Sequence, residues 1–322
     1  MWSPSDLKAS WTRHVVRARP APSEAARSAA IDLQFDELVA MRGRRASFGR
    51  NQRIDGFRFG DLSSRRRGTG LELDNIGPYQ WGDDIRHMDW FATARTGRPQ
   101  VKQFRHDVQQ TIILVLDLRP SMLFGSRHQL MAKTACLAAA KIAWTTSKDH
   151  QPLGLLLIDG KGAEAVRPRR GRRGRLQHLA RIVDAYGRAV GQVGDPSPWL
   201  TDRLEGLPSS MSGDVEAVFI SDFSRLGMGF DQRIRETGAK GGLSAIVIED
   251  DLMLTPPPAG TYPLRGDLDQ RLATVAIRKG DADLYDMQAE QERRSLTARL
   301  LSLGMRQVLM SDAQSINEGY FR

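Results

Sequence analysis

The chain has 322 residues with 40% hydrophobic and 26% charged side chains, a balance that is typical of a globular protein. Its apolar runs, such as residues 112–116, are far shorter than the roughly 18 residues that a membrane-spanning helix needs, and the N-terminal residues lack an apolar signal core. We therefore expect a cytoplasmic protein without a membrane span. The single cysteine, Cys136, excludes an internal disulfide. The net charge of +9 favours acidic partners but does not choose among nucleic acid, acidic proteins and membrane surfaces.

The N-terminal part of the chain is predicted to contain an arm and a short helix. Residues 1–30 are rich in Ala, Ser, Pro and Arg and have no apolar period, which predicts a mobile basic arm. Residues 31–46 fit a short helix, because their apolar side chains recur at helical spacing. The apolar face of this helix comprises Ile31, Phe35, Leu38 and Val39.

Residues 54–110 differ from the rest in their short runs and their many Gly, Asp, Arg and aromatic residues. Apolar and polar side chains alternate in 70–76 and in 99–105, which predicts two strands that each have one face in water. We therefore expect residues 31–110 to form the short helix and then a small β annex.

From residue 111 the pattern changes to buried strands that alternate with helices. Near-continuous apolar runs predict parallel strands at 111–116, 153–158, 215–220 and 243–248, with a last strand at 307–310. Apolar stripes at helical spacing predict helices at 129–146, 174–188, 231–238 and around 296–303, the last capped by Gly304. A hairpin at 159–162 returns as an antiparallel edge strand at 164–167, and the prolines at 256–258 indicate a rigid connector. The alternation predicts an α/β, Rossmann-like domain over residues 111–322.

Acidic and hydroxyl residues follow the ends of three predicted strands. Asp117 and Ser121 follow the first, Ser221 and Asp222 follow the third, and the fourth ends in Glu-Asp-Asp. Thr201 begins a predicted short helix between them. The carboxyl ends of parallel strands meet at one edge of a sheet, where open α/β sheets place their ligand sites, so Asp117 and Asp222 can approach each other. An Asp after a strand is also a common turn or capping residue, which is a purely structural interpretation.

The strand end Asp117-Leu-Arg-Pro-Ser121 resembles the metal-ion-dependent adhesion site of von Willebrand factor type A domains. In that site an Asp-x-Ser-x-Ser strand end, a Thr loop and an Asp loop hold Mg²⁺, so the resemblance implies Asp117, Ser121, Thr201 and Asp222 as metal candidates. Arg119 stands where the first serine would be, and a guanidinium beside the ion is costly. We therefore expect no cofactor and no metal, with Arg119 forked onto Asp117 or Asp222 in place of the cation.

The annex carries a longer signature. The run Trp81-Gly-Asp-Asp-Ile-Arg-His-Met-Asp-Trp90, followed by Ala94-Arg95 and Val101-Lys-Gln-Phe104, resembles the bacterial family called domain of unknown function 58 (DUF58). Ser121, Met122, Phe124, Gly125, Lys133 and residues 221–223 extend this resemblance. The charged and aromatic signature residues are Asp83, Asp84, Arg86, Asp89, Trp90 and Arg95. Their charges suit a salt-bridged network that stabilises the annex or docks it on the type A domain, and partner contact is the alternative.

A dense basic run places six arginines within residues 167–175. A solvated loop, a surface for an acidic protein and a nucleic-acid site all fit such a run, although no interleaved aromatic residues are present to stack bases.

No catalytic set emerges from the sequence. The six histidines lack metal-binding spacing, and neither a Walker A motif nor a Gly-x-Ser-x-Gly elbow is present. The family resemblance implies a partnership with a MoxR-type AAA+ ATPase and with other type A domain proteins. We expect a non-enzymatic adaptor in complex assembly or maturation, whose partner-binding residues are Asp117, Arg119, Ser121, Thr201 and Asp222. A divalent-metal-dependent binder or enzyme at the same face is the alternative, and nucleic-acid binding through the arginine run is a third hypothesis.

Overall fold

The computed structural model describes residues 29–42, 67–81, 83–105, 111–126, 128–147, 151–192, 197–207, 215–238, 241–265 and 272–311. The chain divides into two compact units. The main unit comprises residues 1–55 and 111–322, and the annex comprises residues 56–110. Each unit is described by itself.

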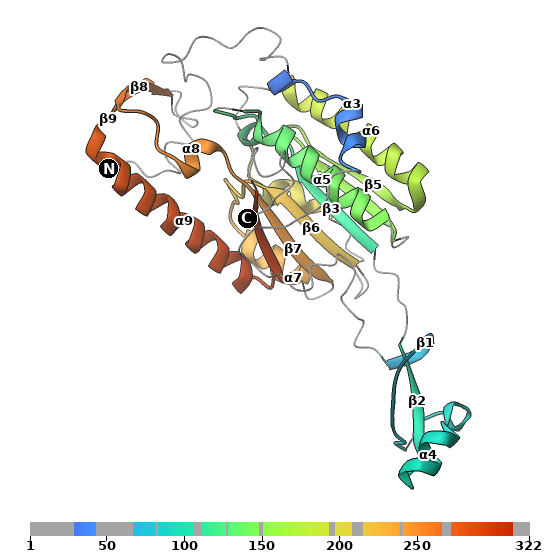
Figure 1. Cartoon of the computed structure of the whole chain (residues 1–322). Coiled ribbons are helices and arrows are strands. Elements are labelled where there is room, and N and C mark those ends of the chain that lie inside the picture. Colours follow the sequence, from blue (N-terminus) through green and yellow to red (C-terminus); the bar gives the residue numbers. More distant parts are fainter. Residues whose placement is uncertain are drawn as a thin grey trace. The chain divides into compact units, whose positions relative to one another are not determined.

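The main unit is built on a six-stranded sheet with the strand order β10-β7-β6-β3-β4-β5 (Figure 1). The strands are β3 (Thr111–Asp117), β4 (Leu153–Ile158), β5 (Ala163–Arg169), β6 (Val215–Ser221), β7 (Gly242–Ile248) and β10 (Gln307–Ser311). All neighbouring pairs of this sheet are parallel except β4 with β5, which forms the predicted antiparallel edge. The central strands are buried along almost their whole length. The predicted α/β fold class is therefore confirmed.

Helices cover both faces of the sheet (Figure 1). On one face α3 (Phe35–Ala40), α5 (Met131–Ser147) and α6 (Gly171–Val190) contact one another. On the other face lie α7 (Phe230–Gly238) and α9 (Ala282–Ser302). The α5 helix is rich in fully buried alanines, and their small side chains let it approach the sheet closely. Gly304 follows α9 with a φ of 89°, as a C-terminal capping glycine requires.

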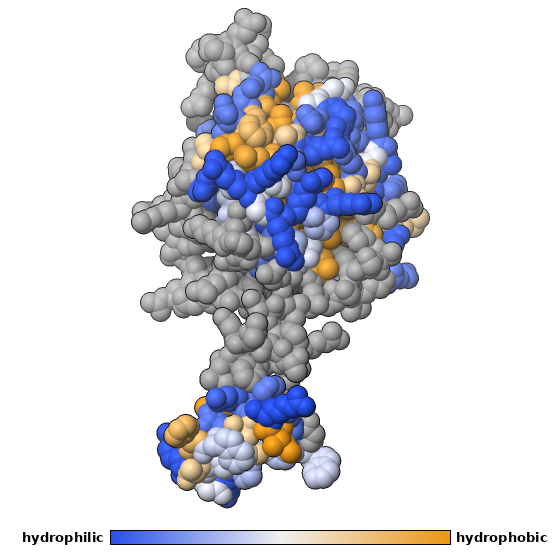
Figure 2. All heavy atoms as spheres, turned by 90° about the vertical axis from the view of Figure 1, so that its right-hand side faces the viewer, coloured by the Kyte–Doolittle hydropathy of each residue, from blue (hydrophilic) through white to orange (hydrophobic). Residues whose placement is uncertain are grey.

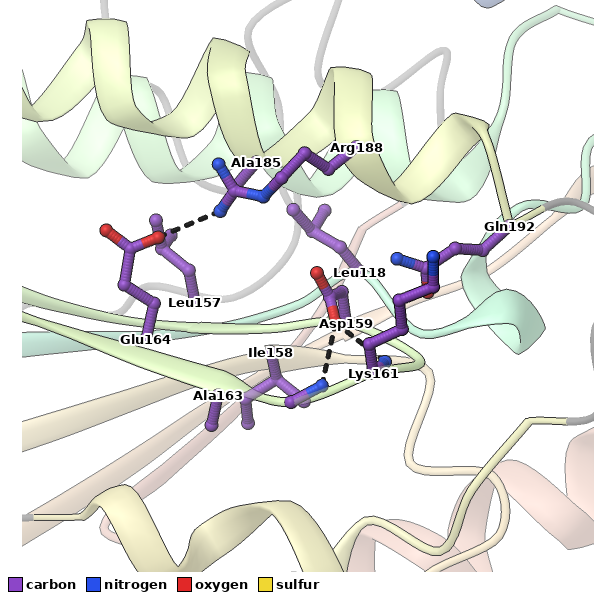
Figure 3. A pocket seen from close by; sticks show the side chains of 11 residues that line it. Leu118, Leu157, Ile158, Asp159, Lys161, Ala163, Glu164, Ala185, Arg188 and Gln192 are labelled. Atoms are coloured by element: carbon purple, nitrogen blue, oxygen red, sulfur yellow. Dashed lines mark hydrogen bonds and ion pairs between the residues drawn. The ribbon is translucent and has the colours of Figure 1, made fainter.

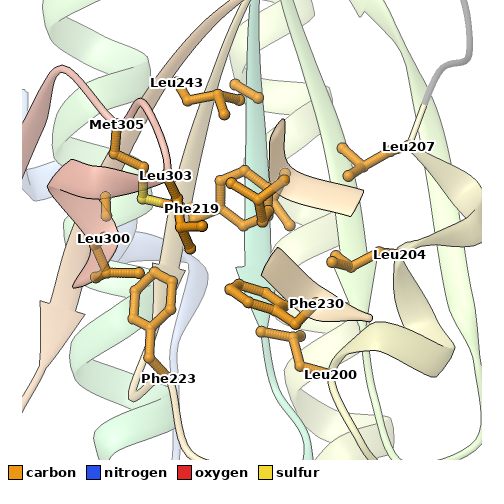
Figure 4. Packing of buried hydrophobic residues seen from close by; sticks show 14 of the residues in the cluster. Leu200, Leu204, Leu207, Phe219, Phe223, Phe230, Leu243, Leu300, Leu303 and Met305 are labelled. Carbon is orange, nitrogen blue, oxygen red and sulfur yellow. The ribbon is translucent and has the colours of Figure 1, made fainter. Parts of the chain in front are cut away.

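A hydrophobic cluster joins the second helical layer to the sheet (Figure 4). It combines Phe219 of β6 with Phe230 of α7 and Leu300 of α9. Leu200 and Leu204 contribute from the short helix η3 (Thr201–Gly206) and the residue before it. Burial of each such side chain contributes roughly 1.5–3 kcal/mol, so the cluster fixes η3 and the loop after β6 against the sheet.

The helix that we expected ahead of the annex belongs instead to the main unit, because α3 packs on α5 and α6. Its predicted apolar face is also corrected, since Leu38 is fully buried but Ile31 and Phe35 are 41% and 36% exposed. The Trp144 indole N–H donates to the Leu38 carbonyl at 2.9 Å, which ties α3 to α5. Residues 1–28, which include most of the predicted arm, lie outside the described residues.

The annex is a two-stranded antiparallel ribbon with a short helical excursion. Its elements are β1 (Arg67–Pro78), the single turn η1 (Ile85–His87), α4 (Trp90–Thr96) and β2 (Gln100–Arg105). The two strands were predicted, whereas α4 was not, because its seven residues are too few to show a clear helical period.

A second hairpin in the main unit was missed. The helix α8 (Asp251–Leu254) is followed by β8 (Gly260–Arg265) and β9 (Leu272–Ile277), which pair with each other alone. Pro263 lies within β8, and proline in a short run argues against a strand unless the strand is at an edge. The predicted proline connector at 256–258 joins α8 to this hairpin.

Candidate functional site

The register of the parallel strands creates the site. Leu116 of β3 pairs with Ile220 of β6, so the following residues, Asp117 and Ser221, are neighbours at the carboxyl edge. The chain runs from β3 outward to β4 and β5 on one side and returns through β6 on the other. The boundary between β3 and β6 is therefore the switch point, where ligands of open α/β sheets bind.

The side chain of Arg119 occupies this switch point. Its Nε donates to Asp117 Oδ1 at 3.0 Å and its Nη2 donates to Asp117 Oδ2 at 2.8 Å, which is the predicted bidentate fork. The backbone N–H of Arg119 also donates to Asp117 Oδ1 at 3.0 Å. Arg119 has no exposed surface, although arginine is among the residues least often buried.

Backbone carbonyls bind the remaining donors of this guanidinium. Pro198 O accepts from Nη1 at 2.8 Å, and Ser224 O accepts from Nη2 at 3.0 Å. Arg225 O lies 3.3 Å from Nη1. Phe223 and Arg225 have φ values of 50° and 49°, a left-handed conformation that is uncommon for such residues. This backbone shape turns the loop after β6 around the guanidinium.

Hydroxyls of the same loop complete a closed network. Ser221 Oγ donates to Asp117 Oδ2 at 2.6 Å and accepts from the N–H of Phe223 at 2.9 Å. The Asp222 carboxylate accepts from the N–H and the hydroxyl of Ser224 at 2.9 and 2.8 Å. Asp222 also lies 3.9 Å from Arg119 Nη2. We call Asp117, Arg119, Ser221 and Asp222 the Arg119 cluster.

The electrostatics of the cluster favour a permanent ion pair. Burial by itself lowers the pKa of Arg119, but the charge of Asp117, the hydrogen bonds to it and the charge of Asp222 outweigh burial, so the pKa is raised. The guanidinium is therefore charged at every physiological pH, and removing either ion would leave the other buried without its partner.

The predicted site residues separate into two groups. Asp117, Arg119 and Asp222 come together as expected, whereas the Thr201 hydroxyl donates elsewhere, to Leu226 O at 2.5 Å. The Ser121 hydroxyl is buried and has no hydrogen-bond partner among the described residues. Sequence reasoning missed the carbonyl acceptors, because a backbone oxygen carries no residue signature.

The residues present do not fit a bound Mg²⁺. Both Asp117 oxygens already accept from Arg119, and one of them also accepts from Ser221. The unpartnered Ser121 hydroxyl is one suitable oxygen, but Mg²⁺ needs about six in an octahedron. A cationic side chain fills the position between the carboxylates. Within the described part of the chain, no group of three or more His, Cys, Asp or Glu residues is placed to hold a metal.

Burial restricts which of the predicted partner-binding residues a partner can touch. Asp117 and Arg119 are fully enclosed, so they act on the surface only by holding its loops. The rim above them is accessible: Trp199 is 47% exposed and Met228 is 97% exposed. The Arg225 guanidinium lies 4.6 Å from the Trp199 ring centroid, a cation–π contact that orders this rim. We call Trp199, Arg225 and Met228 the rim.

The structure explains two residues of the family pattern, Gly125 in the turn before α5 and Lys133 in the first turn of α5. A side chain at Gly125 would bring its Cβ to 2.4 Å from Gln129 O, so only glycine fits. Lys133 is buried, and its Nζ binds Ala29 O, Asp32 O and the Glu37 carboxylate at 2.7–2.9 Å. Lys133 thereby fastens residues 29–37 to α5.

The annex signature forms caps and turns. The Asp83 carboxylate accepts from the N–H of Gln80, Asp84 from that of Arg86, and Asp89 from that of Ala92 at the start of α4. Among the described residues, no ion pair joins these carboxylates to Arg86 or Arg95, so the predicted salt-bridged network is corrected to a set of backbone caps.

Large apolar side chains of the annex are left in solvent. Trp81 is 100% exposed, Phe91 92% and Trp90 67%. Figure 2 shows hydrophobic side chains on the annex surface beside hydrophilic ones.

The basic run is not a solvated loop, which was one of the three interpretations of its sequence. Arg167 and Arg169 belong to β5, and Arg172 and Arg173 lie in the first turn of α6. Arg175 is fully buried and donates to the carbonyls of Ala143, Gln151 and Arg169. One of the six arginines, Arg175, thus binds and supports the backbone, and the others are exposed.

Two cavities lie near the carboxyl edge. The first, of about 450 Å³, lies between the β4–β5 hairpin and the end of α6, where Arg188 pairs with Glu164 at 2.8 Å (Figure 3). The second, of about 320 Å³, lies between the ends of β6 and β7 and the helix α9. We call the second cavity the α9 crevice. In the α9 crevice the Ser224 hydroxyl donates to the Asp222 carboxylate at 2.8 Å, whereas the lining of the first cavity includes no serine, threonine, cysteine or histidine.

Comparison with known proteins identifies relatives of unknown function. The family described as "Protein of unknown function DUF58" matches residues 75–295. Three uncharacterized proteins, one of Mycobacterium bovis and two of Mycobacterium tuberculosis, are each 32% identical over 215 residues. The matched region covers 66% of this chain and 66% of each relative, slightly less than two thirds.

Solved structures show weaker similarity. The conserved hypothetical protein BatB from Bacteroides thetaiotaomicron is 11% identical, with a TM-score of 0.31, over 60% of this chain and 98% of that one. A von Willebrand factor type A protein from Catenulispora acidiphila is 18% identical, with a TM-score of 0.29, over 46% of this chain and 35% of that one. Among the described residues, no helix combines the length and apolarity needed to cross a membrane.

Proposed function

The chain belongs to the DUF58 family of proteins of unknown function, and from its Arg119 cluster we propose that it is a non-enzymatic protein-interaction module. In this proposal it is an adaptor that works with a MoxR-type AAA+ ATPase in the assembly or maturation of a protein complex. Because that partner consumes ATP, we place both proteins in the cytoplasm.

The single observation that carries the proposal is the filled switch point. In an open α/β sheet this crevice normally receives the ligand. Here the Arg119 guanidinium fills it, forked onto Asp117 and bonded to carbonyls of two loops. A site built this way leaves no open coordination position on Asp117, because both of its carboxylate oxygens already accept hydrogen bonds. It does have loops fixed in one shape, which is what a docking surface requires.

The rim is the part of this face that we assign to partner contact. Met228 is almost fully exposed, and Trp199 presents half of its surface. Exposed aromatic, Met and Arg side chains are the types enriched at protein interfaces. The Arg119 cluster lies beneath the rim, because Ser224 and Arg225 supply two of the three carbonyls that bind Arg119 and also form part of the surface loop.

The test is a quantitative binding assay between the purified full chain and a MoxR-type AAA+ ATPase from the same organism. We expect Met228→Asp to weaken binding at least tenfold, because it places a charge in an apolar contact. Met287→Asp is the matched control, since Met287 is 70% exposed on α9 and is not one of the rim residues. With the ATPase in its nucleotide-free form, which carries no Mg²⁺–ATP, we also expect EDTA to leave the affinity unchanged, because an arginine of this chain stands in place of a divalent cation.

Three results would contradict the proposal. The wild-type chain could fail to bind the ATPase, binding could be lost in EDTA, or the two Met→Asp variants could bind equally well. The first result would exclude this ATPase as the partner, and the second would mean that a metal ion takes part in binding. The third would mean that the partner contacts a surface other than the rim.

A further inference from the structure

Large apolar side chains gather in one short segment of the annex. We call residues 79–99, which join the paired strand ends Pro78 and Gln100, the annex tip. The large apolar side chains of the tip that are more than half exposed are Trp81, Ile85, Trp90 and Phe91. The chain enters and leaves the annex at the opposite end of the ribbon, where Arg67 pairs with Arg105. Exposed apolar side chains that gather in this way mark a surface for another molecule, whereas scattered single ones do not.

The annex buries little apolar surface of its own. Among its described residues, Ala92 and Val101 are the buried apolar side chains. A two-stranded ribbon is at best marginally stable in water unless further structure packs against it. A contact at the tip therefore stabilises the annex itself, and the exposed apolar side chains there are available to make it.

The exposed area of the tip is close to what a dimer needs. An aromatic side chain buries roughly 150–250 Å², so the rings of Trp81, Trp90 and Phe91 offer roughly 400–700 Å² in all. Ile85 adds to this area. A specific interface buries about 800 Å² on each partner, so the tip can supply most of one side of an interface.

The charge of the tip favours a second copy of this chain over an anionic molecule. The tip carries three aspartates and three arginines and is neutral overall, although the whole chain has a net charge of +9. A neutral surface attracts neither nucleic acid nor an anionic membrane over long range, and it does not repel its own copy. The tip is thus a part of this basic chain at which two copies approach without like-charge repulsion.

The charged side chains of the tip also suit a two-fold interface. Its three carboxylates accept hydrogen bonds from backbone N–H groups of the tip itself. Arg86, Arg95 and Arg98 are exposed, and no salt bridge holds their side chains among the described residues. In a two-fold dimer each copy presents the same surface, so an arginine of one copy can stack on a ring of the other. Arg225 and Trp199 form a contact of this kind within the chain.

We propose that the annex tip is a homodimer interface, in which Trp81, Trp90 and Phe91 of two copies pack together about a two-fold axis. The arginines of the tip lie around these rings and contact the rings of the other copy. The interface is independent of the proposed ATPase partnership, because it requires only this chain and uses none of the rim residues.

Sedimentation velocity of the full-length chain at several concentrations tests the dimer. We expect the wild type to pass from monomer to dimer as its concentration rises through the micromolar range. Phe91→Glu should raise the dissociation constant at least about a hundredfold, because the two-fold axis makes the substitution act twice and places two like charges in an apolar contact. Folding is not at risk, since Phe91 is 92% exposed in the single chain. Met287→Glu is the matched control and should dimerise like the wild type, because Met287 is exposed on α9 outside the annex.

A cysteine cross-link locates the interface. The single cysteine, Cys136, is fully buried, so a bis-maleimide reagent reacts with an introduced cysteine alone. Ala94→Cys should give a covalent dimer in high yield, because Ala94 is exposed on α4 within the tip. Ala298→Cys should give little, because Ala298 is exposed on α9 outside the annex. Adding Phe91→Glu to Ala94→Cys should abolish the cross-link.

The proposal is wrong if the wild type stays monomeric at every concentration, if Phe91→Glu dimerises as the wild type does, or if Ala298→Cys cross-links as efficiently as Ala94→Cys. Flotation with phosphatidylglycerol vesicles identifies a different occupant. A wild-type chain that stays monomeric and floats with the vesicles, while Phe91→Glu does not, would assign the tip to a membrane surface and overturn the dimer. Because none of these measurements contains the ATPase, such results leave the proposed function untouched.

Discussion

Buried ionisable groups have different partners at the two edges of the central sheet. At the carboxyl edge, Arg119 is paired with Asp117 and its pKa is raised. At the amino edge, Arg175 is equally buried but bonds to neutral backbone carbonyls, and burial lowers its pKa to about 10. Glu216 and His178 lie at the same amino edge. Burial raises the pKa of Glu216 and lowers the pKa of His178, so it favours the neutral form of each.

This difference separates a site from a scaffold. A buried ion pair rarely contributes more stability than apolar residues of the same volume would, so its presence calls for a role beyond stability. The Arg119 pair organises two surface loops that contain the rim. The amino-edge groups instead join strands and helices: Arg175 ties α6 to residues at the end of α5 and before β4.

The largest expected effect comes from unpairing the carboxyl edge. Arg119→Met should destabilise the main unit by about 3–5 kcal/mol, because it leaves the Asp117 charge buried without its partner. The measurement is urea unfolding followed by circular dichroism. The double variant Arg119→Met/Asp117→Asn should recover most of the loss, since neither ion remains. If the double variant were as unstable as the single one, the cost would lie in packing and not in charge.

The central strands and the Arg119 fork were predictable from the sequence, because both follow from local patterns. The run from Thr111 to Leu116 is apolar throughout, and Arg119 is only two residues from the carboxylate that it binds. The carbonyls that complete the cluster were not predictable. They are positioned by the left-handed conformations of Phe223 and Arg225, which neither residue type favours.

The amino edge was predicted less well, for a related reason. Arg175 belongs to a run of arginines that looks uniformly solvated in the sequence. Only the packing of α6 against α5 decides that this one side chain points inward. Composition therefore did not distinguish the one buried arginine, which supports the backbone, from the exposed arginines around it.

A metal can be used to sharpen the contrast further. Arg119→Ser creates the Asp-x-Ser-x-Ser pattern of the adhesion site and removes the competing cation. We expect this variant to gain stability with Mg²⁺, by about 2.7 kcal/mol when the ion is at 100 times its dissociation constant. The wild-type chain should show no shift in melting temperature between EDTA and Mg²⁺. A Mg²⁺-dependent shift in the wild type would contradict the interpretation of Arg119 as the replacement for the ion.

The corresponding change at the amino edge should cost less. Arg175→Met removes a charge that has no carboxylate partner, so only the three carbonyl acceptors lose their donor. We expect a loss of roughly 1–3 kcal/mol in the same urea experiment. A loss larger than that of Arg119→Met would reverse the ranking of the two edges.

The smallest effect is expected at Glu216, where its size depends on pH. Burial raises the pKa of this carboxyl, while the hydrogen bond from Ser244 Oγ at 2.6 Å and the charge of Arg306 oppose the shift. A raised folded-state pKa means that the contribution to stability is present at low pH and is lost as pH rises through that pKa.

Glu216→Gln keeps the oxygen that accepts from Ser244 and removes the buried charge. We therefore expect the variant to be more stable than the wild type by about 1 kcal/mol at pH 7 and nearly equal to it at pH 4. Melting curves across this pH range measure the difference, and a variant that is less stable at pH 7 would mean that Arg306 holds Glu216 as a true ion pair, as Arg119 holds Asp117 at the opposite edge.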